Sequence, residues 1–174
     1  MIHGDIKPQN VLVFKDATGT TVKVADFGYS TLAVGESEKV FLPKSRPWNA
    51  PEHHFGEFNV FEAKKTDVYS FGLLCLWVLL VHSLPDIPQT TAEGATELIS
   101  FDASHSSRTV LEQLKNEDRL EAIANQYMET VPLADLNAEQ RIHLKQFFSL
   151  TVTFEPKKRT SDLGRLMVIF SQAQ

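Results

Sequence analysis

The first ten residues, MIHGDIKPQN, place three different polar groups in one short stretch of chain. Lys7 follows Asp5 by two residues, Asn10 follows it by five, and Pro8 restricts the backbone between them. We expect a tight loop in which these side chains converge. Such a loop supplies a carboxylate, a cation and an amide oxygen.

A second carboxylate follows in the tetrapeptide ADFG, residues 25–28. Gly28 allows the chain to turn sharply there, and Asp26 is available as a ligand. Mg²⁺ is usually held by one or two carboxylate or amide oxygens together with the phosphates of a substrate. Asn10 and Asp26 provide oxygens of this kind, so the sequence predicts a Mg²⁺ site if the two residues come together.

The elements that would bring them together are two β-rich runs, NVLVF (10–14) and VKVADF (22–27), separated by KDATGTT. This pattern predicts a short hairpin with Gly19 in its turn. From residue 28 to residue 51 no periodicity persists, and prolines interrupt the segment. We expect a long loop there, of the kind that is often tied to function.

Helical patterns dominate the rest of the chain. Thr66 or Asp67 is predicted to begin an apolar helix that ends near Ser83. Residues 85–108 are polar and rich in Ser and Thr, which predicts a connecting insertion that could contain one short helix. Beyond it, apolar residues recur at helical spacing: Val110, Leu111, Leu114, Leu120, Ile123, Ala124 and Tyr127.

Two further helices are predicted near the C-terminus. Asn137 is followed three positions later by Gln140, a pattern typical of a capping box at a helix start. The last helix should follow Thr160 and Ser161. Its inner face is predicted to carry Leu163, Leu166, Met167 and Phe170.

The composition indicates one globular domain of 174 residues, of which 43% are hydrophobic. A net charge of −5, without long runs of Lys or Arg, does not suggest binding to nucleic acid or to an anionic membrane surface. The longest apolar stretch is shorter than the roughly 20 residues that a membrane span needs. The single cysteine, Cys75, is predicted to be a buried thiol and suits a reducing, intracellular compartment, cytoplasmic or nuclear.

The motifs together closely resemble those of the eukaryotic-type protein kinases. The catalytic loop of that family reads H-R-D-x-x-x-x-N and is followed by D-F-G and A-P-E. This chain has HGDIKPQN at 3–10, DFG at 26–28 and APE at 50–52. DVYSFG at 67–72 is similar to the start of the central helix of the large lobe, and FEPKKRTS at 154–161 to the stretch before its last helix. The resemblance implies a mainly α-helical C-terminal lobe with a small β-hairpin.

The resemblance also implies a role for each matched residue. Asp5 would be the catalytic base or orienting group that accepts the proton of the substrate hydroxyl, and Lys7 would stabilise the transferring phosphoryl group. Asn10 and Asp26 would hold Mg²⁺. A Lys two residues after the catalytic Asp is typical of serine/threonine kinases. Ser45 falls where that class has a Ser or Thr that contacts the base and shapes the substrate site.

Other matched residues are implied to support the site. Glu52 would form an ion pair with Arg159 and so anchor the activation segment, and Asp67 would accept hydrogen bonds from the backbone of the catalytic loop. His3 and Phe27 would pack in the core that links the loop to the hairpin.

Several conspicuous residues have simpler interpretations. The adjacent His53 and His54 lack the ligand spacing of a metal site, so a structural or surface role is favoured. Trp48 and Trp77 are expected to be packing residues. Phosphorylation sites could lie in the loop at Ser30, Thr31 and Ser37.

The chain departs from the family pattern at two places. Gly4 stands where most kinases have an Arg that pairs with a phosphorylated residue of the activation segment, so we expect no activation through that contact. The chain also contains no G-x-G sequence, and Lys23 precedes DFG rather than lying on the strand that binds ATP phosphates. Without the small lobe, the remaining groups of the nucleotide site are expected to face water.

We therefore expect a partial protein kinase domain over residues 1–174. ATP and Mg²⁺ are the expected cofactors, and a protein with Ser or Thr hydroxyls and the missing N-terminal lobe, in cis, are the expected partners. The alternative is a non-catalytic half-kinase or pseudokinase that acts as a binding module. The expected parts are a catalytic loop (1–10), a hairpin (11–25), an activation segment (26–52), a central helix (64–83), an insertion (85–108) and C-terminal helices (109–174).

Overall fold

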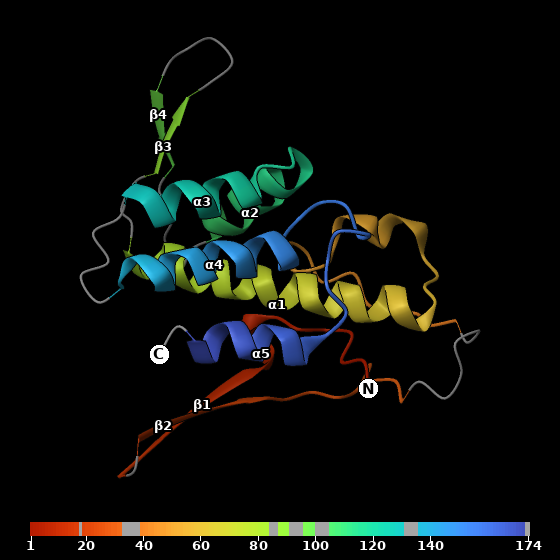
Figure 1. The fold of residues 1–174 in the computed structure, drawn as a ribbon. Helices are drawn as coiled ribbons and strands as arrows, with labels where there is room; N and C mark the ends of the chain where they lie inside the picture. The colour runs from red at the N-terminus through yellow and green to blue at the C-terminus, as the bar shows by residue number, and fades with distance from the viewer. Residues whose placement is uncertain are drawn as a thin grey trace.

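The computed structural model describes residues 1–17, 19–32, 39–83, 87–90, 96–99, 105–130 and 136–172. Helices dominate it, and a two-stranded antiparallel hairpin lies near the N-terminus, so the predicted fold class is confirmed (Figure 1). The long helix α1 (Val60–Ser83) runs through the centre of the molecule, and α4 (Ala138–Thr151) packs against it as well as against α3 (Leu120–Thr130) and α5 (Leu163–Gln172). Ser37 lies outside the described residues.

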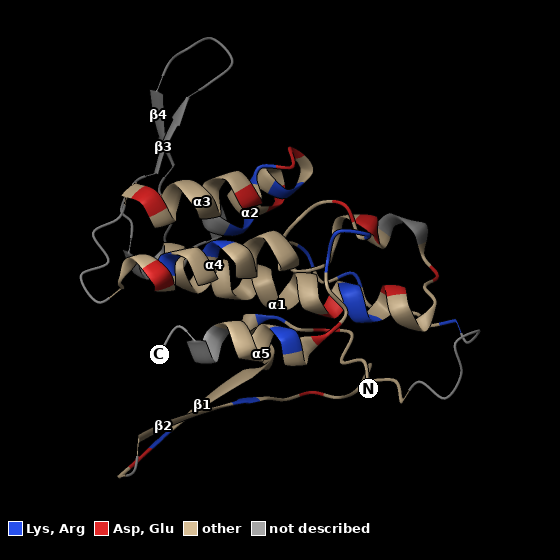
Figure 2. Ribbon diagram, in the orientation of Figure 1, with Lys and Arg blue, Asp and Glu red and all other residues tan. Residues whose placement is uncertain are grey.

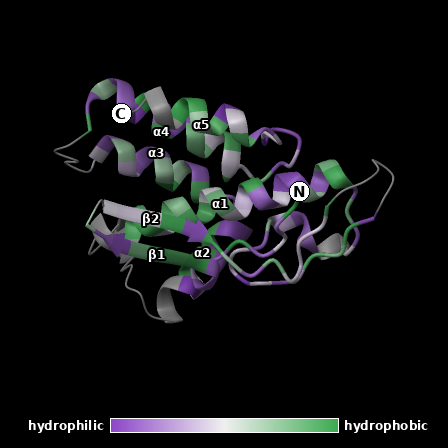
Figure 3. Ribbon diagram, turned by 90° about the horizontal axis from the view of Figure 1, so that it is seen from below, coloured by the Kyte–Doolittle hydropathy of each residue, from purple (hydrophilic) through white to green (hydrophobic). Residues whose placement is uncertain are grey.

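The N-terminal hairpin consists of β1 (Val11–Asp16) and β2 (Gly19–Val24), paired from Val11 opposite Val24 to Asp16 opposite Gly19. A 3-10 helix at Pro8–Asn10 leads into it. Apolar side chains on both strands are exposed, and β1 is largely hydrophobic along its length (Figure 3). The exposed ones are Leu12, Val13, Phe14, Val22 and Val24.

Helix α1 (Val60–Ser83) begins earlier than predicted, so the expected start at Thr66 or Asp67 was wrong. A capping box explains the difference: the Glu62 backbone N–H donates to Asn59 Oδ1 at 3.0 Å, and the Asn59 N–H donates to Glu62 Oε2 at 2.9 Å. The two pairs satisfy backbone donors that the first helical turn would otherwise leave free.

Four more helices follow: α2 (His105–Asn116), α3 (Leu120–Thr130), α4 (Ala138–Thr151) and α5 (Leu163–Gln172). The helical pattern of residues 110–127 is thus divided between α2 and α3, and Asp118 adopts a left-handed φ of 54° between them. The predicted cap of α4 is confirmed, since Asn137 and Gln140 form a capping box. Helix α4 contacts α1, α3 and α5.

Two sequence predictions near these helices need correction. Within residues 85–108 the structure has a second hairpin, β3 (Ile87–Thr90) and β4 (Thr96–Ile99), and the start of α2. On α5, Leu166 is buried as expected, but Leu163 and Met167 are 53% and 67% exposed. Ile169 is buried instead, because it lies three residues from Leu166 on the face toward the core. The side chain of Phe170 lies outside the described part.

The core lies between α1 and the helices around it. Trp48 is buried and meets Trp77 edge to face, with ring centroids 5.6 Å apart, so both are packing residues. The Cys75 thiol also packs against this core, and burial raises its pKa to about 12. Acidic and basic residues are interspersed along the helices (Figure 2). Within the described residues, no helix combines the length and apolar character that crossing a membrane requires.

Candidate active site

The structure brings four of the predicted site residues together around the carboxylate of Asp5. Its Oδ2 accepts hydrogen bonds from Lys7 Nζ at 2.6 Å and from Asn10 Nδ2 at 3.2 Å. Asn10 Nδ2 also donates to the Asp5 carbonyl at 2.8 Å, and Lys7 Nζ donates to Ser45 Oγ at 3.2 Å. One ammonium group therefore links the loop carboxylate to a hydroxyl of the activation segment.

The carboxylate and the amide of this cluster are buried. Asp5 is 4% and Asn10 6% exposed, so the expectation that the remaining groups face water was wrong for both. Two contacts account for this burial. The 3-10 turn at Pro8–Asn10 folds the loop over Asp5, and the distant segment that contains Ser45 lies against the loop. Burial strengthens the interaction between the Asp5 carboxylate and the Lys7 ammonium, because little water screens it.

Asp26 lies at the same end of the hairpin as Asn10. The Ala25 backbone N–H donates to the Asn10 carbonyl at 2.8 Å, which continues the strand pairing to the residue before Asp26. Asp26 has a left-handed φ of 62°, and its exposed Oδ1 accepts the backbone N–H of Gly28 at 3.2 Å. The backbone turn thus leaves the Asp26 carboxylate accessible.

The donor atoms at this end of the hairpin fit a hard cation. Asn10 has an amide oxygen and Asp26 a carboxylate, and Mg²⁺ prefers such oxygens while it keeps several waters or phosphate oxygens as further ligands. Within the described residues no group of three or more His, Cys, Asp and Glu could hold a metal ion. A cation at this place would therefore depend on these two residues and on a bound phosphate.

Asp67, on α1, accepts two hydrogen bonds from the backbone of the catalytic loop. Its Oδ2 accepts the backbone N–H of His3 at 2.6 Å, and its Oδ1 accepts that of Gly4 at 2.8 Å. Burial raises the pKa of Asp67, and the two backbone hydrogen bonds oppose that shift. Helix α1 thereby fixes the backbone of the two residues that precede Asp5, His3 and Gly4.

His3 and Phe27 do not share one buried environment. His3 is 7% exposed, and its Nε2 lies 3.0 Å from the Ala25 carbonyl, which ties the loop to the hairpin. Phe27 contacts the His3 ring at a centroid distance of 5.1 Å but is 51% exposed. The expectation that Phe27 packs in the core was wrong, because its other side is not covered by any described residue.

Gly4 occupies a position that a larger residue would strain. Its φ is +83°, and a Cβ added there would lie 3.1 Å from Leu42 Cδ2 and 3.2 Å from the Tyr29 carbonyl oxygen. An Arg with this backbone would need both an unfavourable φ and movement of its neighbours. The local backbone therefore suits the Gly that stands in place of the Arg of the usual H-R-D sequence.

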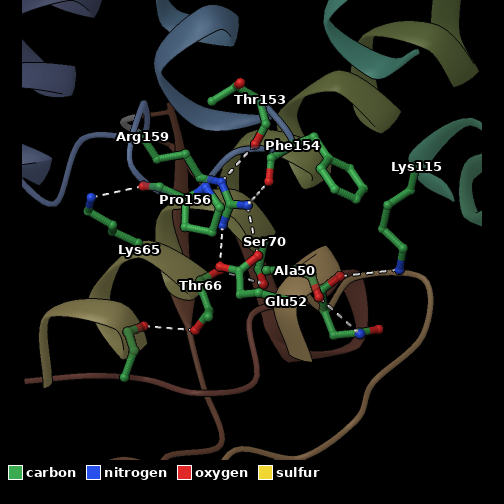
Figure 4. Close-up of polar contacts among 12 residues, drawn as sticks. Ala50, Glu52, Lys65, Thr66, Ser70, Lys115, Thr153, Phe154, Pro156 and Arg159 are labelled. Carbon is green, nitrogen blue, oxygen red and sulfur yellow. Dashed lines mark hydrogen bonds and ion pairs between the residues drawn. The ribbon is translucent and has the colours of Figure 1, made fainter. Parts of the chain in front are cut away.

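The activation segment is anchored by an ion pair between Glu52 and Arg159 (Figure 4). Arg159 Nη1 donates to Glu52 Oε1 at 2.5 Å and Nη2 donates to Oε2 at 2.8 Å. Two further donors reach the carbonyls of Thr153 and Phe154, both at 2.8 Å, and the guanidinium lies 4.7 Å from the centroid of the Tyr69 ring. The buried guanidinium therefore has partners on every side.

A second anchor of this segment was missed in the sequence. Lys115 on α2 is 2% exposed, and its Nζ donates to the carbonyls of Pro47 at 2.8 Å and Asn49 at 3.2 Å and pairs with Glu112. Burial lowers the pKa of Lys115 despite Glu112. The available signal was its position, since Lys115 lies four residues after Leu111 on the buried face of the helix.

Comparison with known proteins identifies the class of this chain. The protein kinase domain family matches residues 1–168. The chain therefore belongs to the protein kinase domain family.

Individual relatives match shorter stretches. The chain is 37% identical over 102 residues to the probable serine/threonine-protein kinase gdt8 of Dictyostelium discoideum, which covers 54% of this chain and 7% of that protein. It is 40% identical over 86 residues to the dual specificity protein kinase shkD of the same organism (49% and 11%). It is 33% identical over 104 residues to the tyrosine-protein kinase transforming protein Abl of Abelson murine leukemia virus (58% and 13%). The matches thus span only 7–13% of the lengths of these relatives.

Proposed function

We propose that this chain forms the catalytic-loop and activation-segment part of a serine/threonine protein kinase, which transfers the γ-phosphoryl group of ATP to a protein hydroxyl. The observation that carries the proposal is the contact of Lys7 with both Asp5 and Ser45. A Lys and a Ser in these two positions are features that the resemblance links to serine/threonine kinases. Relatives of three specificities match the chain, so specificity has to be measured directly.

The roles follow from the arrangement around Asp5. Its Oδ2 lies beside the Lys7 ammonium and would orient a substrate hydroxyl and accept its proton. Lys7 would then stabilise negative charge on the phosphoryl group during transfer. Asn10 and Asp26 would hold a Mg²⁺ ion, which neutralises charge on the nucleotide phosphates when it is bound.

We further propose that the segments that cover ATP lie outside these 174 residues, in the small lobe of the same kinase. Asp26 and the apolar hairpin side chains, among them Leu12 and Phe14, are exposed, as expected for surfaces that a small lobe and a nucleotide would cover. The isolated chain should accordingly bind MgATP weakly and transfer phosphate negligibly. Robust phosphorylation of casein by the purified chain alone, abolished by Asp5→Ala, would refute this part.

The test of the main proposal uses the full-length protein that contains this chain. Phosphate transfer from ATP to mixed protein substrates should label Ser and Thr, and Asp5→Asn should abolish it while the protein remains folded by circular dichroism. Glu139→Gln, which removes an exposed carboxylate on α4, is the matched control and should leave the rate unchanged. Equal rates for wild type and Asp5→Asn would overturn the proposal, and label on Tyr alone would overturn its specificity.

A second candidate is a non-catalytic binding module. The exposed apolar side chains of β1 and β2, Val13 at 65% and Val22 at 60% among them, favour it, because a hairpin of this kind tends to be covered by another surface. If this candidate holds, the full-length protein should show no transfer. Val13→Lys should then abolish capture of a partner, whereas the kinase proposal predicts transfer that depends on Asp5.

A further inference from the structure

Three buried hydrogen-bond acceptors lie close to the catalytic loop and have no partner within the part of the chain that the structure describes. They are Oδ1 of Asp5, Oδ1 of Asn49 and Nδ1 of His53. These three residues are 4%, 8% and 4% exposed, respectively. Leaving a buried polar atom unpaired is costly, so each of these atoms needs an explanation.

The protonation of His53 follows from its other nitrogen. Nε2 lies 3.3 Å from the Leu42 carbonyl oxygen, which can only accept, so Nε2 carries the proton. Burial lowers the pKa of His53, although Glu52 opposes the shift. The ring is therefore neutral near pH 7, and its Nδ1 is an acceptor like the two side-chain oxygens.

All three residues line one small cavity beneath the catalytic loop. Its volume is about 10 Å³, which is close to the minimum that a single water molecule occupies. Thr66 and Ser70 of α1 complete its wall, and their hydroxyls donate to helix carbonyls at 2.8 and 3.0 Å. These two hydroxyls offer only lone pairs to the cavity. Ser45, whose Oγ accepts a hydrogen bond from Lys7, is the other hydroxyl in its wall.

We propose that one water molecule is bound in this cavity, where it donates one hydrogen bond to Asp5 Oδ1 and the other to Asn49 Oδ1 or His53 Nδ1. Lys7 and Asn10 hold Oδ2 of the same carboxylate, so the water fixes the second oxygen and with it the rotation of the carboxylate. Whichever of Asn49 and His53 accepts the second hydrogen bond is thereby a positioning residue for Asp5. The importance of that orientation for phosphoryl transfer rests on the proposed function.

The site links the two segments that must be in register for catalysis. Asp5 belongs to the loop, whereas Asn49 and His53 flank the APE sequence of the activation segment. The backbone carbonyl of Asn49 also accepts a hydrogen bond from Lys115, which fixes this residue from the other side. A displaced activation segment would therefore release the water and leave Asp5 free to rotate.

The first test is a crystal structure of the full-length protein at a resolution that shows ordered water. The inference requires a single density peak in the cavity at about 2.7–3.0 Å from Asp5 Oδ1 and from at least one of the other two acceptors. An empty cavity would overturn it, and so would a peak at the shorter distances typical of a bound metal ion.

The second test removes the acceptors. The double substitution of Asn49→Leu with His53→Leu should abolish the density peak, rotate the Asp5 carboxylate and lower kcat at least about tenfold, with KM changed little. His53→Asn keeps a polar atom near the position of Nδ1 and should retain the peak and most of kcat. The matched control is His143→Leu on α4, because His143 Nδ1 is also buried without a described partner but does not line the cavity.

The two proposals fail in different ways. A water peak in a protein that transfers no phosphate would refute the proposed function and retain the water site. Transfer by a protein that lacks the peak, or an unchanged kcat and carboxylate orientation in the double variant, would refute the inference and retain the function.

Discussion

The ion pair between Glu52 and Arg159 offers the sharpest test of how the activation segment is held. Glu52→Gln keeps the shape of the side chain but removes the charge that faces the guanidinium. Arg159 has 0% of its side chain exposed and Glu52 13%, so the substitution leaves a buried cation without a counter-charge. The backbone acceptors at Thr153 and Phe154 remain, but they carry no charge.

The expected loss of stability can be bounded from this geometry. Breaking a buried ion pair from one side costs about 3–5 kcal/mol. Because Glu52 keeps some access to water, we expect a value near the lower limit, about 3 kcal/mol. In a chain of 174 residues that corresponds to a fall in melting temperature of about 6–12 °C.

Urea unfolding of the wild type and of Glu52→Gln measures the loss of free energy of unfolding, and calorimetry measures the fall in melting temperature. The matched control is Glu155→Gln, since Glu155 pairs with Lys158 at 2.8 Å but both side chains are 60% or more exposed. Water screens that exposed pair, so its loss should change the free energy of unfolding far less than the loss of the buried one. If Glu52→Gln costs no more than Glu155→Gln, the guanidinium is not held by charge and the reasoning fails.

Three further predictions concern other contacts. Gly72→Ala should lower stability by about 1–3 kcal/mol in urea unfolding, because its Cβ would lie 2.3 Å from Thr151 Oγ1 where α1 meets α4; an unchanged midpoint would contradict that close packing. Lys115→Met should speed hydrogen exchange around Trp48, since two carbonyls lose their donor, and unaltered exchange would count against the anchor. His53 has a lowered pKa when folded, so the unfolded chain binds its proton more tightly and stability should fall as pH drops below about 6.5. His53→Leu should weaken that pH dependence of the free energy of unfolding, and an identical slope would refute it.

The features that sequence predicted well are those set by neighbouring residues. The capping box at Asn137 and Gln140 needs only local spacing, and the strands around Gly19 follow from β-rich runs and a turn. The same logic was available for α1, where Asn59 and Glu62 form an unrecognised capping box. Because this capping box was not recognised, the helix was predicted to begin at Thr66 or Asp67 instead of Val60.

The features that sequence could not decide depend on what covers each surface. The resemblance implied that Phe27 packs in the core, and a helical pattern placed Met167 on a buried face, yet both are more than half exposed. Asp5 was expected to face water, but the folded loop and the segment around Ser45 enclose it. Burial of this kind arises from contacts between residues about 40 positions apart, and local periodicity carries no information about them.

The candidate site shows the same difference between features set by neighbouring residues and features set by distant contacts. The order of the motifs was enough to propose Asp5, Lys7, Asn10 and Asp26 as one site. It did not reveal Lys115, or the polar cavity beside Asn49, because those contacts join α2 and the activation segment to the loop from distant parts of the chain.

The most direct test of the account is the transfer of labelled phosphate from ATP by the full-length protein, with phosphoamino-acid analysis of the product. The account predicts Mg²⁺-dependent label on Ser and Thr that disappears in Asp5→Asn, while Glu139→Gln retains it. A full-length protein that binds MgATP and yet gives no label, or gives the same label without the Asp5 carboxylate, would contradict it.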